Sequence, residues 1–502
     1  MNQQLNIIVD GKRQLTAAGV MLSDITNGGK PCGGHGKCGK CKVVARGKLS
    51  DPGDAELKHL TAEELAMGVR LACQTYVLGD CEITTMSQCE KLQTVTYGAM
   101  PEFEIAPVFS KYGVAIDIGT TTLAARLYDN KGNMLAVASL ANPQQKWGAD
   151  VVSRIGAALG GRLRELSKAI RQALDSIISE LSTRAVIDAG DMDGVVITGN
   201  TVMLSLLTEQ SVEPFSHAPF AAERLFGEML TGGDLELFNL MPDTPIYIPP
   251  CISAFIGADT TCAILATELC DNGTAMMADI GTNGEMALWH NGRLTVCSTA
   301  AGPAFEGVGI TMGMVCADGA IDRVTVENGE LKTHVIGDTA PVGLCGSGLA
   351  DAVACLLDLK TIDESGYLEE NAFIASPSVY ITPKDIRMLQ LAKSAICAGL
   401  LTLICEAELA VSDISGFYIA GGFGSYLCKE SAIRIRLLPK ALADVSTTVG
   451  NAALSGAVML LLNAEARTAV QDIVHDINVL DLSVNSVFSQ LFMMNMSFGE
   501  EE

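Results

Sequence analysis

Four cysteines near the start of the chain have the spacing of metal-cluster ligands. Cys32, Cys38 and Cys41 form C-x5-C-x2-C within PCGGHGKCGKC, and 31 residues separate the third from Cys73. Three thiolates on one tight loop and a distant fourth are typical of a [2Fe–2S] cluster, in which each iron takes two cysteine sulfurs. Zinc is the alternative, but zinc sites usually combine two close C-x2-C pairs, and Cys73 has no near partner before Cys81. The spacing therefore predicts a [2Fe–2S] cluster.

The loop between these cysteines is rich in glycine, and the segments around it must form a small domain that presents it. A loop that wraps closely on an inorganic core and aims backbone N–H groups at sulfur favours residues without a Cβ. Simple loop flexibility is the other interpretation. Strands are expected at LNIIVDG, CKVVARG and CEITTM, and a short helix near VMLSDIT. The glycines concerned are Gly33, Gly34, Gly36 and Gly39.

This arrangement resembles the plant- and adrenodoxin-type ferredoxins over residues 1 to about 90. The resemblance implies a β-grasp fold and single-electron transfer. Cys81 and Cys89 are expected to be spare or buried thiols, because four ligands already suffice. A basic run could steer an acidic redox partner or form a solvated rim that offsets the cluster charge. It comprises Lys30, Lys37, Lys40, Lys42, Arg46 and Lys48.

A second set of candidate residues lies on two similar hairpins, AIDIGTTT and ADIGTNGE. In each, an apolar strand ends at an aspartate, and Asp117 and Asp279 are 162 residues apart, which indicates a duplication at domain scale. Glycine lets backbone N–H groups approach phosphate, threonine adds donors, and the aspartate can hold Mg²⁺. One such motif alone would be an ordinary turn. The predicted nucleotide-binding residues are Gly119, Thr120, Thr121, Thr122, Gly281, Thr282 and Asn283.

Further glycine-rich segments follow apolar strands. Gly421, Gly422 and Gly424, in IAGGFGSYL, would let the backbone pack flat against an adenine or ribose. GLCGSGLADAVACLL and VGNAALSGAVMLLL place small residues at helix starts, which suits close helix packing or plain cap chemistry. VVITGNTVMLSLL ends a strand before a helix. Asp150, in the first turn of a predicted helix, is a candidate for water activation or metal contact, or a residue that serves the helix dipole.

In this order the motifs resemble the acetate and sugar kinase, heat-shock protein and actin superfamily of ATPases, across residues 112 to about 465. The resemblance implies two facing lobes that bind ATP and Mg²⁺. By resemblance, Asp117 and Asp279 are the Mg²⁺ and phosphate carboxylates, and the later G-G motif holds the adenosine. The expected fold is therefore an α+β β-grasp ferredoxin domain followed by α/β duplicated ribonuclease H-like lobes of the actin-type ATPases.

The composition limits the partners and compartments that suit the chain. Its 502 residues predict several domains, and 34 basic against 58 acidic residues leave a formal charge of −24, which argues against nucleic acid. Runs such as GAVMLLLNA are shorter than the ~18 residues of a membrane span, and no export signal is visible, so a cytoplasmic protein without a membrane partner is expected. Cys262, Cys355 and Cys405 lie in apolar helical patterns and are expected in the core.

The expected domains are a [2Fe–2S] ferredoxin-like domain at 1–92, a linker at 93–111, a two-lobed ATPase domain at 112–465 and a C-terminal extension at 466–502, whose acidic end, SFGEEE, is expected to be a solvated tail. Joined in this way, the motifs resemble the reductive activators of corrinoid proteins. The resemblance implies ATP-dependent reduction of a Co(II) corrinoid protein to Co(I) in a methyltransferase system, with an upstream electron donor, and is compatible with a homodimer. Family members commonly carry a further linker or middle domain, whereas only residues 93–111 separate the two domains here.

Three other functions fit parts of the pattern. An activator of a radical-type dehydratase also drives low-potential electrons with an ATPase of this superfamily, but holds its cluster between two subunits rather than in a fused ferredoxin. A nucleotide-regulated ferredoxin scaffold would bind ATP and a partner without partner-stimulated turnover. A small-molecule kinase would leave the cysteine loop unexplained.

Overall fold

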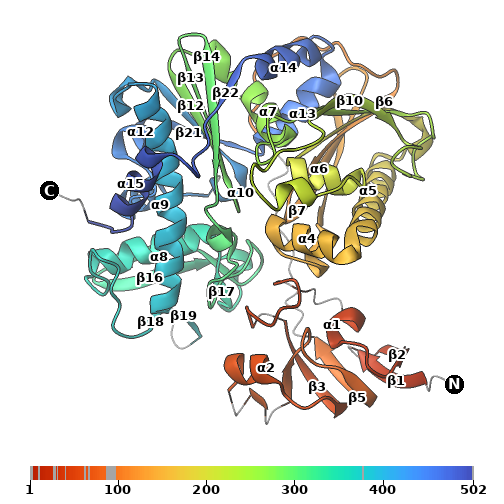
Figure 1. The fold of residues 1–502 in the computed structure, drawn as a ribbon, viewed down its shortest axis with the longest axis vertical. Helices are drawn as coiled ribbons and strands as arrows, with labels where there is room; N and C mark the ends of the chain where they lie inside the picture. Colours follow the sequence, from red (N-terminus) through yellow and green to blue (C-terminus); the bar gives the residue numbers. More distant parts are fainter. Residues whose placement is uncertain are drawn as a thin grey trace.

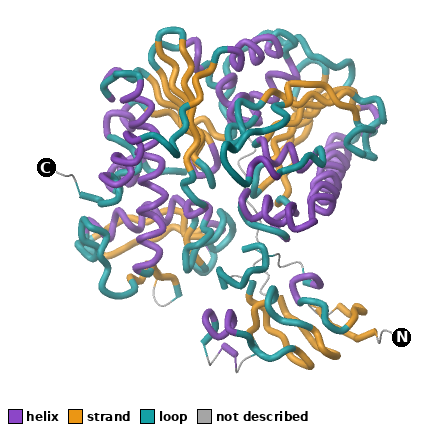
Figure 2. The backbone as a smooth tube through the Cα atoms, in the orientation of Figure 1, coloured by secondary structure: helices purple, strands orange, loops and turns teal. Residues whose placement is uncertain are grey.

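The structure is a computed structural model that describes residues 4–499 except 10–11, 27–29, 31, 40, 62–63, 66–67, 86–97, 376–377 and 425. A small N-terminal sheet domain lies beside two larger lobes, and each lobe is built on its own sheet (Figure 1). Helices pack against these sheets (Figure 2). The described part of the chain thus has the predicted order of one small domain and two similar lobes.

The N-terminal domain is a five-stranded sheet of order β2-β1-β5-β3-β4. The central pair, β1 and β5, is parallel, and the other pairs are antiparallel. Alternate apolar residues such as Ile7, Val43 and Ile83 are buried on one face, as is Cys81, whereas Cys89 lies outside the described residues. The elements are β1 (Gln4–Val9), β2 (Lys12–Ala17), α1 (Leu22–Ile25), β3 (Lys42–Leu49), α2 (Asp54–His59), β4 (Val69–Leu71) and β5 (Val77–Thr85).

The first lobe is a six-stranded sheet of order β10-β11-β9-β6-β7-β8. Strands β6, β9 and β11 run parallel, and β6, β7 and β8 form an antiparallel meander, so the predicted hairpin is the β6–β7 turn. The elements are β6 (Tyr112–Ile118), β7 (Thr122–Asp129), β8 (Met134–Ala141), α4 (Val151–Ala157), α5 (Leu163–Ala185), β9 (Met192–Gly199), α6 (Thr201–Leu207), β10 (Phe226–Thr231), β11 (Pro245–Pro250) and α7 (Ala258–Ala266).

The sheet of the second lobe, β21-β20-β12-β13-β14-β22, repeats this arrangement. Strands β12, β20 and β21 are parallel, and β12, β13 and β14 form the matching meander. The duplication predicted from the two hairpins is confirmed by this shared topology. The sheet strands are β12 (Ala275–Ile280), β13 (Gly284–His290), β14 (Arg293–Thr299), β20 (Gly416–Ala420), β21 (Ser446–Gly450) and β22 (Ile477–Val479).

The remaining elements after β14 include two small sheets, β16-β15-β17 and β18-β19, and helices, of which α13 and α14 contact strands and helix α7 of the first lobe. They are β15 (Ala320–Glu327), β16 (Glu330–Val335), β17 (Gly343–Leu344), α8 (Gly346–Asp358), β18 (Ala372–Ala375), β19 (Val379–Ile381), α9 (Pro383–Glu406), α10 (Gly421–Gly424), α11 (Lys429–Arg434), α12 (Lys440–Asp444), α13 (Ala452–Leu462), α14 (Ala466–His475) and α15 (Ser486–Met494).

Small residues let α7 of the first lobe pack closely on α13 of the second. A Cβ on Gly456 would lie 2.0 Å from the carbonyl oxygen of Cys262, so glycine alone permits this approach. Within α8, a Cβ on Gly348 would meet the carbonyl oxygen of Ile321 at the same distance. The close packing predicted for both glycine-rich helix starts is therefore present.

Helix α9 is long and apolar enough to cross a membrane by composition, which the sequence reasoning missed, but 78% of its most apolar stretch is buried inside the protein. It is therefore explained as a core helix of the second lobe. Cys262 and Cys355 are buried as expected, whereas the expectation for Cys405 is wrong. The last turn of α9, which includes Cys405 and Glu406, reaches the surface.

The segments before and after the ATPase motifs bind to the lobes. In the expected linker, Ala99 and Ala106 donate backbone hydrogen bonds to the carbonyls of Val449 and Leu462, both 2.8 Å long. At the other end, β22 pairs with β14, and Phe498 is buried. The expectation of a solvated tail is therefore wrong for residues 497–499, because Phe498 and the buried Lys393 pack together.

An ion pair is buried in the N-terminal domain between α2 and β4. Glu56 accepts hydrogen bonds from Nε and Nη2 of Arg70, each 2.9 Å long, and from the hydroxyl of Thr75 at 3.0 Å. Burial by itself raises the pKa of Glu56, but the bonds from Arg70 and Leu71 outweigh it, so the pKa lies below its usual value. The ionised pair therefore stabilises the domain above the ordinary glutamate range, and this stabilisation is lost as the pH falls through the folded-state pKa.

We predict that Glu56→Ala lowers the free energy of unfolding of this domain by about 3 kcal/mol at pH 7, because the buried Arg70 loses its partner. The difference from wild type should shrink towards pH 3. Urea titrations with amide exchange of residues 69–85 as the readout measure it, with the exposed Glu82→Ala as the control. Equal stability of Glu56→Ala and wild type at pH 7 would contradict the prediction.

Candidate functional site

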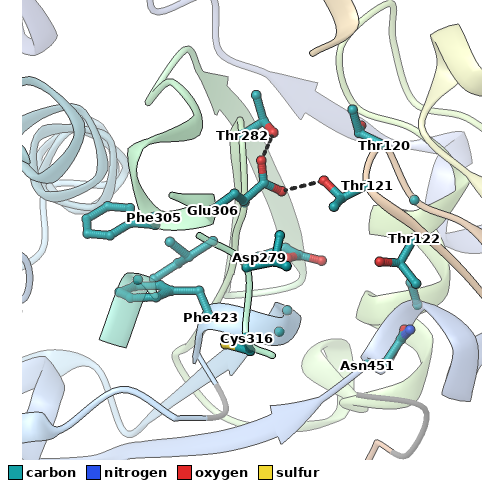
Figure 3. A pocket seen from close by; sticks show the side chains of 18 of the residues that line it. Thr120, Thr121, Thr122, Asp279, Thr282, Phe305, Glu306, Cys316, Phe423 and Asn451 are labelled. Atoms are coloured by element: carbon teal, nitrogen blue, oxygen red, sulfur yellow. Dashed lines mark hydrogen bonds between the residues drawn. The ribbon is translucent and has the colours of Figure 1, made fainter. Parts of the chain in front are cut away.

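A cleft of about 290 Å³ lies between the two lobes, and both hairpin tips reach it (Figure 3). The turn of the first tip is closed by a bond from Gly119 N to the carbonyl of Thr122 (3.0 Å), and that of the second by Gly281 N to Asn283 (2.9 Å). Residues singled out by sequence that line the cleft are Asp117, Gly119, Thr120, Thr121, Thr122, Asp279, Gly281, Thr282, Asn283, Gly421 and Gly422.

Glu306 links the two tips, and sequence reasoning missed it. It ends a short 3₁₀ helix, Pro303–Glu306, and accepts hydrogen bonds from the hydroxyl of Thr121 at 3.4 Å and from that of Thr282 (Figure 3). One carboxylate therefore joins the first lobe to the second across the cleft. No local signal in PAFEG marks this glutamate, because its role depends on two threonines far away in the chain.

Five carboxyl groups line the cleft, while no lysine or arginine is among its described lining residues. Burial raises the pKa of Asp117 and Asp279 to about 7 and that of Asp259 to about 6. Burial likewise raises the pKa of Glu285 and Glu306. Because ionised carboxylates repel one another in a poorly solvated site, this cleft favours a cation or a Mg²⁺-bound ligand over a bare anion.

Asp259, which sequence reasoning missed, stands at the start of α7 and faces the cleft. The glycine before it is close-packed, because a Cβ on Gly257 would lie 2.7 Å from Asp259 Oδ1. Its signal was the G-A-D before an apolar helix in FIGADTTCAIL. Asn200 caps α6 in a similar strand-to-helix position and donates to the hydroxyl of Thr120 at 3.3 Å.

Asp150 does not line the cleft in the described structure. It caps α4, with its two carboxylate oxygens accepting from the backbone N and the hydroxyl of Ser153 at 2.7 and 2.9 Å. Of the two interpretations offered for Asp150, the structure shows the helix-terminal one. The acidic helix start that reaches the cleft is Asp259.

Gly421 and Gly422 form the floor of the cleft beside Asp279. Gly421 has φ +89°, and a Cβ there would lie 2.5 Å from Asp279 Oδ1, so a side chain would obstruct this carboxylate. Gly424 is instead a packing residue, since its Cβ would meet Ile419 at 2.5 Å. Phe305 and Phe423 stack with centroids 4.3 Å apart along one wall (Figure 3). Flat backbone and an aromatic wall are surfaces on which a base can lie.

The four cysteines of the N-terminal domain converge. Cys41 Sγ lies 3.2 Å from Cys73 Sγ, and Cys32 hydrogen-bonds with Cys38 and Cys73. The loop between them needs glycine, because its backbone takes positive φ values that residues with a Cβ rarely adopt. These values are +68°, +85°, +66° and +66° at Gly33, Gly34, Gly36 and Gly39.

The basic run around this loop is partly neutralised, because Lys30 pairs with Asp24 at 2.8 Å and Lys42 with Glu64 at 2.6 Å. Lys40 lies outside the described residues. Lys37, Arg46 and Lys48 are exposed and have no ion pair among the described residues, so the solvated rim and the steering surface both stay predictions.

The thiols present fit the ligand set of a [2Fe–2S] cluster, which needs two thiolates per iron and brings its own sulfides. Among the described residues, no group of three or more His, Cys, Asp or Glu side chains forms a ready-made site for one metal ion. The thiol contacts join Cys32 to Cys38 and to Cys73, and Cys41 to Cys73, so four thiolates are available in one place.

We predict that, without nucleotide, Asp279→Asn melts about 3 °C above wild type at pH 8 and closer to it at pH 5. The raised folded-state pKa means that ionisation of Asp279 costs folding stability as the pH rises from the ordinary aspartate range to about 7. Thermal unfolding across this pH range tests it, with the exposed Asp243→Asn as control. A lower melting temperature for Asp279→Asn at pH 8 would refute it.

Residues 112–272 match the family model described as the RACo middle region, and residues 273–502 match the C-terminal domain of RACo, the ASKHA domain. A counterpart of the family's middle region is therefore present and includes the first lobe. The short segment 93–111 had suggested instead that this middle region is missing. An 85-residue stretch is also 38% identical to one of the subunits of the Na(+)-translocating NADH-quinone reductase of Neisseria meningitidis, covering 16% of this chain and 21% of that protein.

Three longer similarities span most of the chain. It is 36% identical to the corrinoid activation enzyme RamQ of Eubacterium limosum, over 78% of this chain and 70% of RamQ. It is 27% identical to the [Co(II) methylated amine-specific corrinoid protein] reductase of Methanosarcina barkeri, over 77% of each protein. A solved reductive activator for corrinoid, iron–sulfur protein superposes with TM-score 0.71 and 27% identity over 98% of both chains. The chain therefore belongs to the RACo family, the reductive activators of corrinoid proteins.

Proposed function

We propose that this protein reduces the Co(II) form of a corrinoid protein of a methyltransferase system to Co(I), and that ATP hydrolysis drives the electron transfer. The observation that carries the proposal is one chain with a converging four-thiol loop and a two-lobed cleft built from duplicated D-x-G-T hairpins. The relatives named as a corrinoid activation enzyme and a Co(II) corrinoid protein reductase support this substrate class.

Cys32, Cys38, Cys41 and Cys73 would hold a [2Fe–2S] cluster, in a domain whose sheet order and central parallel pair support a β-grasp ferredoxin fold. When bound, such a cluster supplies single electrons, at about −400 mV in plant-type ferredoxins. Gln74 stiffens the loop, since its Nε2 donates to the carbonyl of Gly34 at 2.7 Å. An upstream electron donor must deliver each electron.

The cleft would take ATP with Mg²⁺. Asp117 and Asp279 would hold the ion together with phosphate oxygens, and Asn451 fixes Asp117 through a 3.0 Å hydrogen bond. The tip N–H and hydroxyl groups would bind the phosphates, and the Gly421–Gly422 backbone the adenosine. Asp259 would accept the proton of the attacking water, because a pKa of about 6 suits a general base near neutral pH. Asp150 is not assigned this role, since Ser153 engages both its oxygens.

Nucleotide is needed because the electron transfer is otherwise rare. Each ~59 mV of unfavourable potential lowers the equilibrium yield of a one-electron step tenfold. Closure of the lobes on ATP would change the surface that meets the corrinoid protein, and hydrolysis would reset it.

The test is the visible spectrum of a Co(II) corrinoid protein under anaerobic reductant, with this protein and with or without ATP–Mg²⁺. We predict Co(I) only when nucleotide is present. Equal Co(I) without ATP would favour a ferredoxin with a regulatory lobe. No Co(I) with any corrinoid protein of a methyltransferase system would redirect the search to another low-potential acceptor, such as a dehydratase.

Two substitutions should separate the electron site from the nucleotide site. We predict that Cys73→Ser abolishes Co(I) formation but leaves ATP binding intact, because Cys73 lies outside the cleft. Asp279→Asn should instead leave the cluster spectrum unchanged and lower partner-stimulated ATP hydrolysis at least about 100-fold, through loss of Mg²⁺ binding. Isothermal titration with AMP-PNP, visible spectra and phosphate release measure these effects, and unchanged Co(I) delivery by Asp279→Asn would support a scaffold.

A further inference from the structure

A single segment, Asn142–Arg154, holds the first hairpin tip from behind. The backbone N of Asn142 and Nε2 of Gln145 both donate to the carbonyl of Thr121, each at 2.9 Å. Nδ2 of Asn142 donates to the carbonyl of Gly119, also at 2.9 Å. These bonds engage the tip carbonyls, while the Thr121 hydroxyl reaches Glu306 in the cleft. The position of the tip therefore depends on this segment.

Arg154 completes the attachment with a buried charge. Its guanidinium is fully buried, and Nη2 donates to the carbonyl of Thr120 at 2.5 Å while Nε donates to that of Gly148 at 3.0 Å. Burial lowers the pKa of Arg154 only to about 10, so the group stays charged at neutral pH. Arg154 makes no ion pair with the described residues within 4.0 Å, although the charges of Asp150 and Glu306 are near enough to raise its pKa against the effect of burial. Buried charges are normally paired. The Arg154 guanidinium binds a carbonyl of the hairpin tip that is proposed to hold phosphate, so it is suited to respond to an anion bound there.

The middle of the segment lies beside the cysteine loop. A Cβ on Gly33, which follows Cys32, would lie 3.3 Å from the carbonyl oxygen of Trp147. Trp147 directly precedes Gly148, whose carbonyl Arg154 binds. In Figure 1 the N-terminal domain lies next to the α4 end of the first lobe, where this contact occurs. The guanidinium of Arg154 therefore connects the Thr120 carbonyl to the Gly148 carbonyl, and the neighbouring Trp147 carbonyl lies beside Gly33.

We propose that Arg154 is a positioning residue that couples nucleotide occupancy to the cysteine loop through the Asn142–Arg154 segment. This inference rests on the proposed nucleotide site and adds a route by which that site acts on the electron donor. Phosphate bound at the tip would attract the Arg154 guanidinium. The guanidinium would then hold the Thr120 and Gly148 carbonyls in one fixed arrangement. The Trp147 carbonyl beside Gly33 would then be held in place, and the described residues between 30 and 41 would be more ordered with nucleotide than without.

The test is hydrogen–deuterium exchange of the cluster-loaded full chain with and without Mg–AMP-PNP under anaerobic conditions. In wild type, nucleotide should slow amide exchange at residues 119–122. It should also slow exchange at residues 30–41 by about fivefold or more, as expected for a typical coupling between sites. Arg154→Met should still bind AMP-PNP, with the effect at 30–41 reduced below about twofold, and Arg154→Lys should retain part of it. Arg162→Met, at an exposed arginine near the start of the next helix, is the matched control and should behave as wild type.

The outcomes separate this inference from the proposed function. No protection at 119–122 in wild type would mean that the nucleotide site itself is wrongly assigned. Protection at 119–122 without any at 30–41 would overturn the coupling alone, as would full protection at 30–41 in Arg154→Met. If Arg154→Met does not fold, Gln145→Ala replaces it, because this half-buried side chain contributes one bond to the Thr121 carbonyl. Wild-type protection in Gln145→Ala would likewise overturn the proposal.

Discussion

Five carboxyl groups are concentrated in one cleft, and the packing of the two lobes has to offset the repulsion between them. Asp117, Asp259, Asp279, Glu285 and Glu306 share a space whose described lining contains no basic side chain. Their mutual repulsion opposes closure of the lobes, so apolar packing must hold the two halves together from behind. The close approach of α7 and α13 at Gly456 provides that packing. On the proposed function, Mg²⁺ and phosphate would close the lobes on the cleft side.

The duplication explains why this constraint can act as a switch. Each lobe offers the same hairpin, and the two tips meet the same glutamate, Glu306, through Thr121 and Thr282. A carboxylate that bridges two hydroxyl donors competes with phosphate for them. Arrival of ATP would therefore exchange one link between the lobes for another, rather than fill an empty gap. Two arrangements of similar energy are what a nucleotide needs if it is to shift a population.

The hairpins, the glycine turns and the thiol loop could be predicted from local sequence. Each is encoded within a dozen residues by strand patterning and by glycines that the backbone requires. Asp259, Glu306 and the Phe305–Phe423 wall could not be found in this way. They join the site only after segments far apart in the chain are folded together. Asp150 shows a different limit, since an acid at a helix start is predicted equally well as a cap or as a site residue, and the structure shows that it caps α4. The docked C-terminus was missed because Phe498 is buried by a helix a hundred residues earlier.

The short connection between the domains has a mechanical consequence. A free linker would only raise the local concentration of the electron donor. Here the described part of residues 93–111 is bonded to Val449 and Leu462, while the cysteine loop lies beside Trp147 of the first lobe. If the lobes move relative to each other, the N-terminal domain must change its position relative to at least one of them. On the proposed function, a nucleotide that moves the lobes would therefore also change how the cysteine loop is placed.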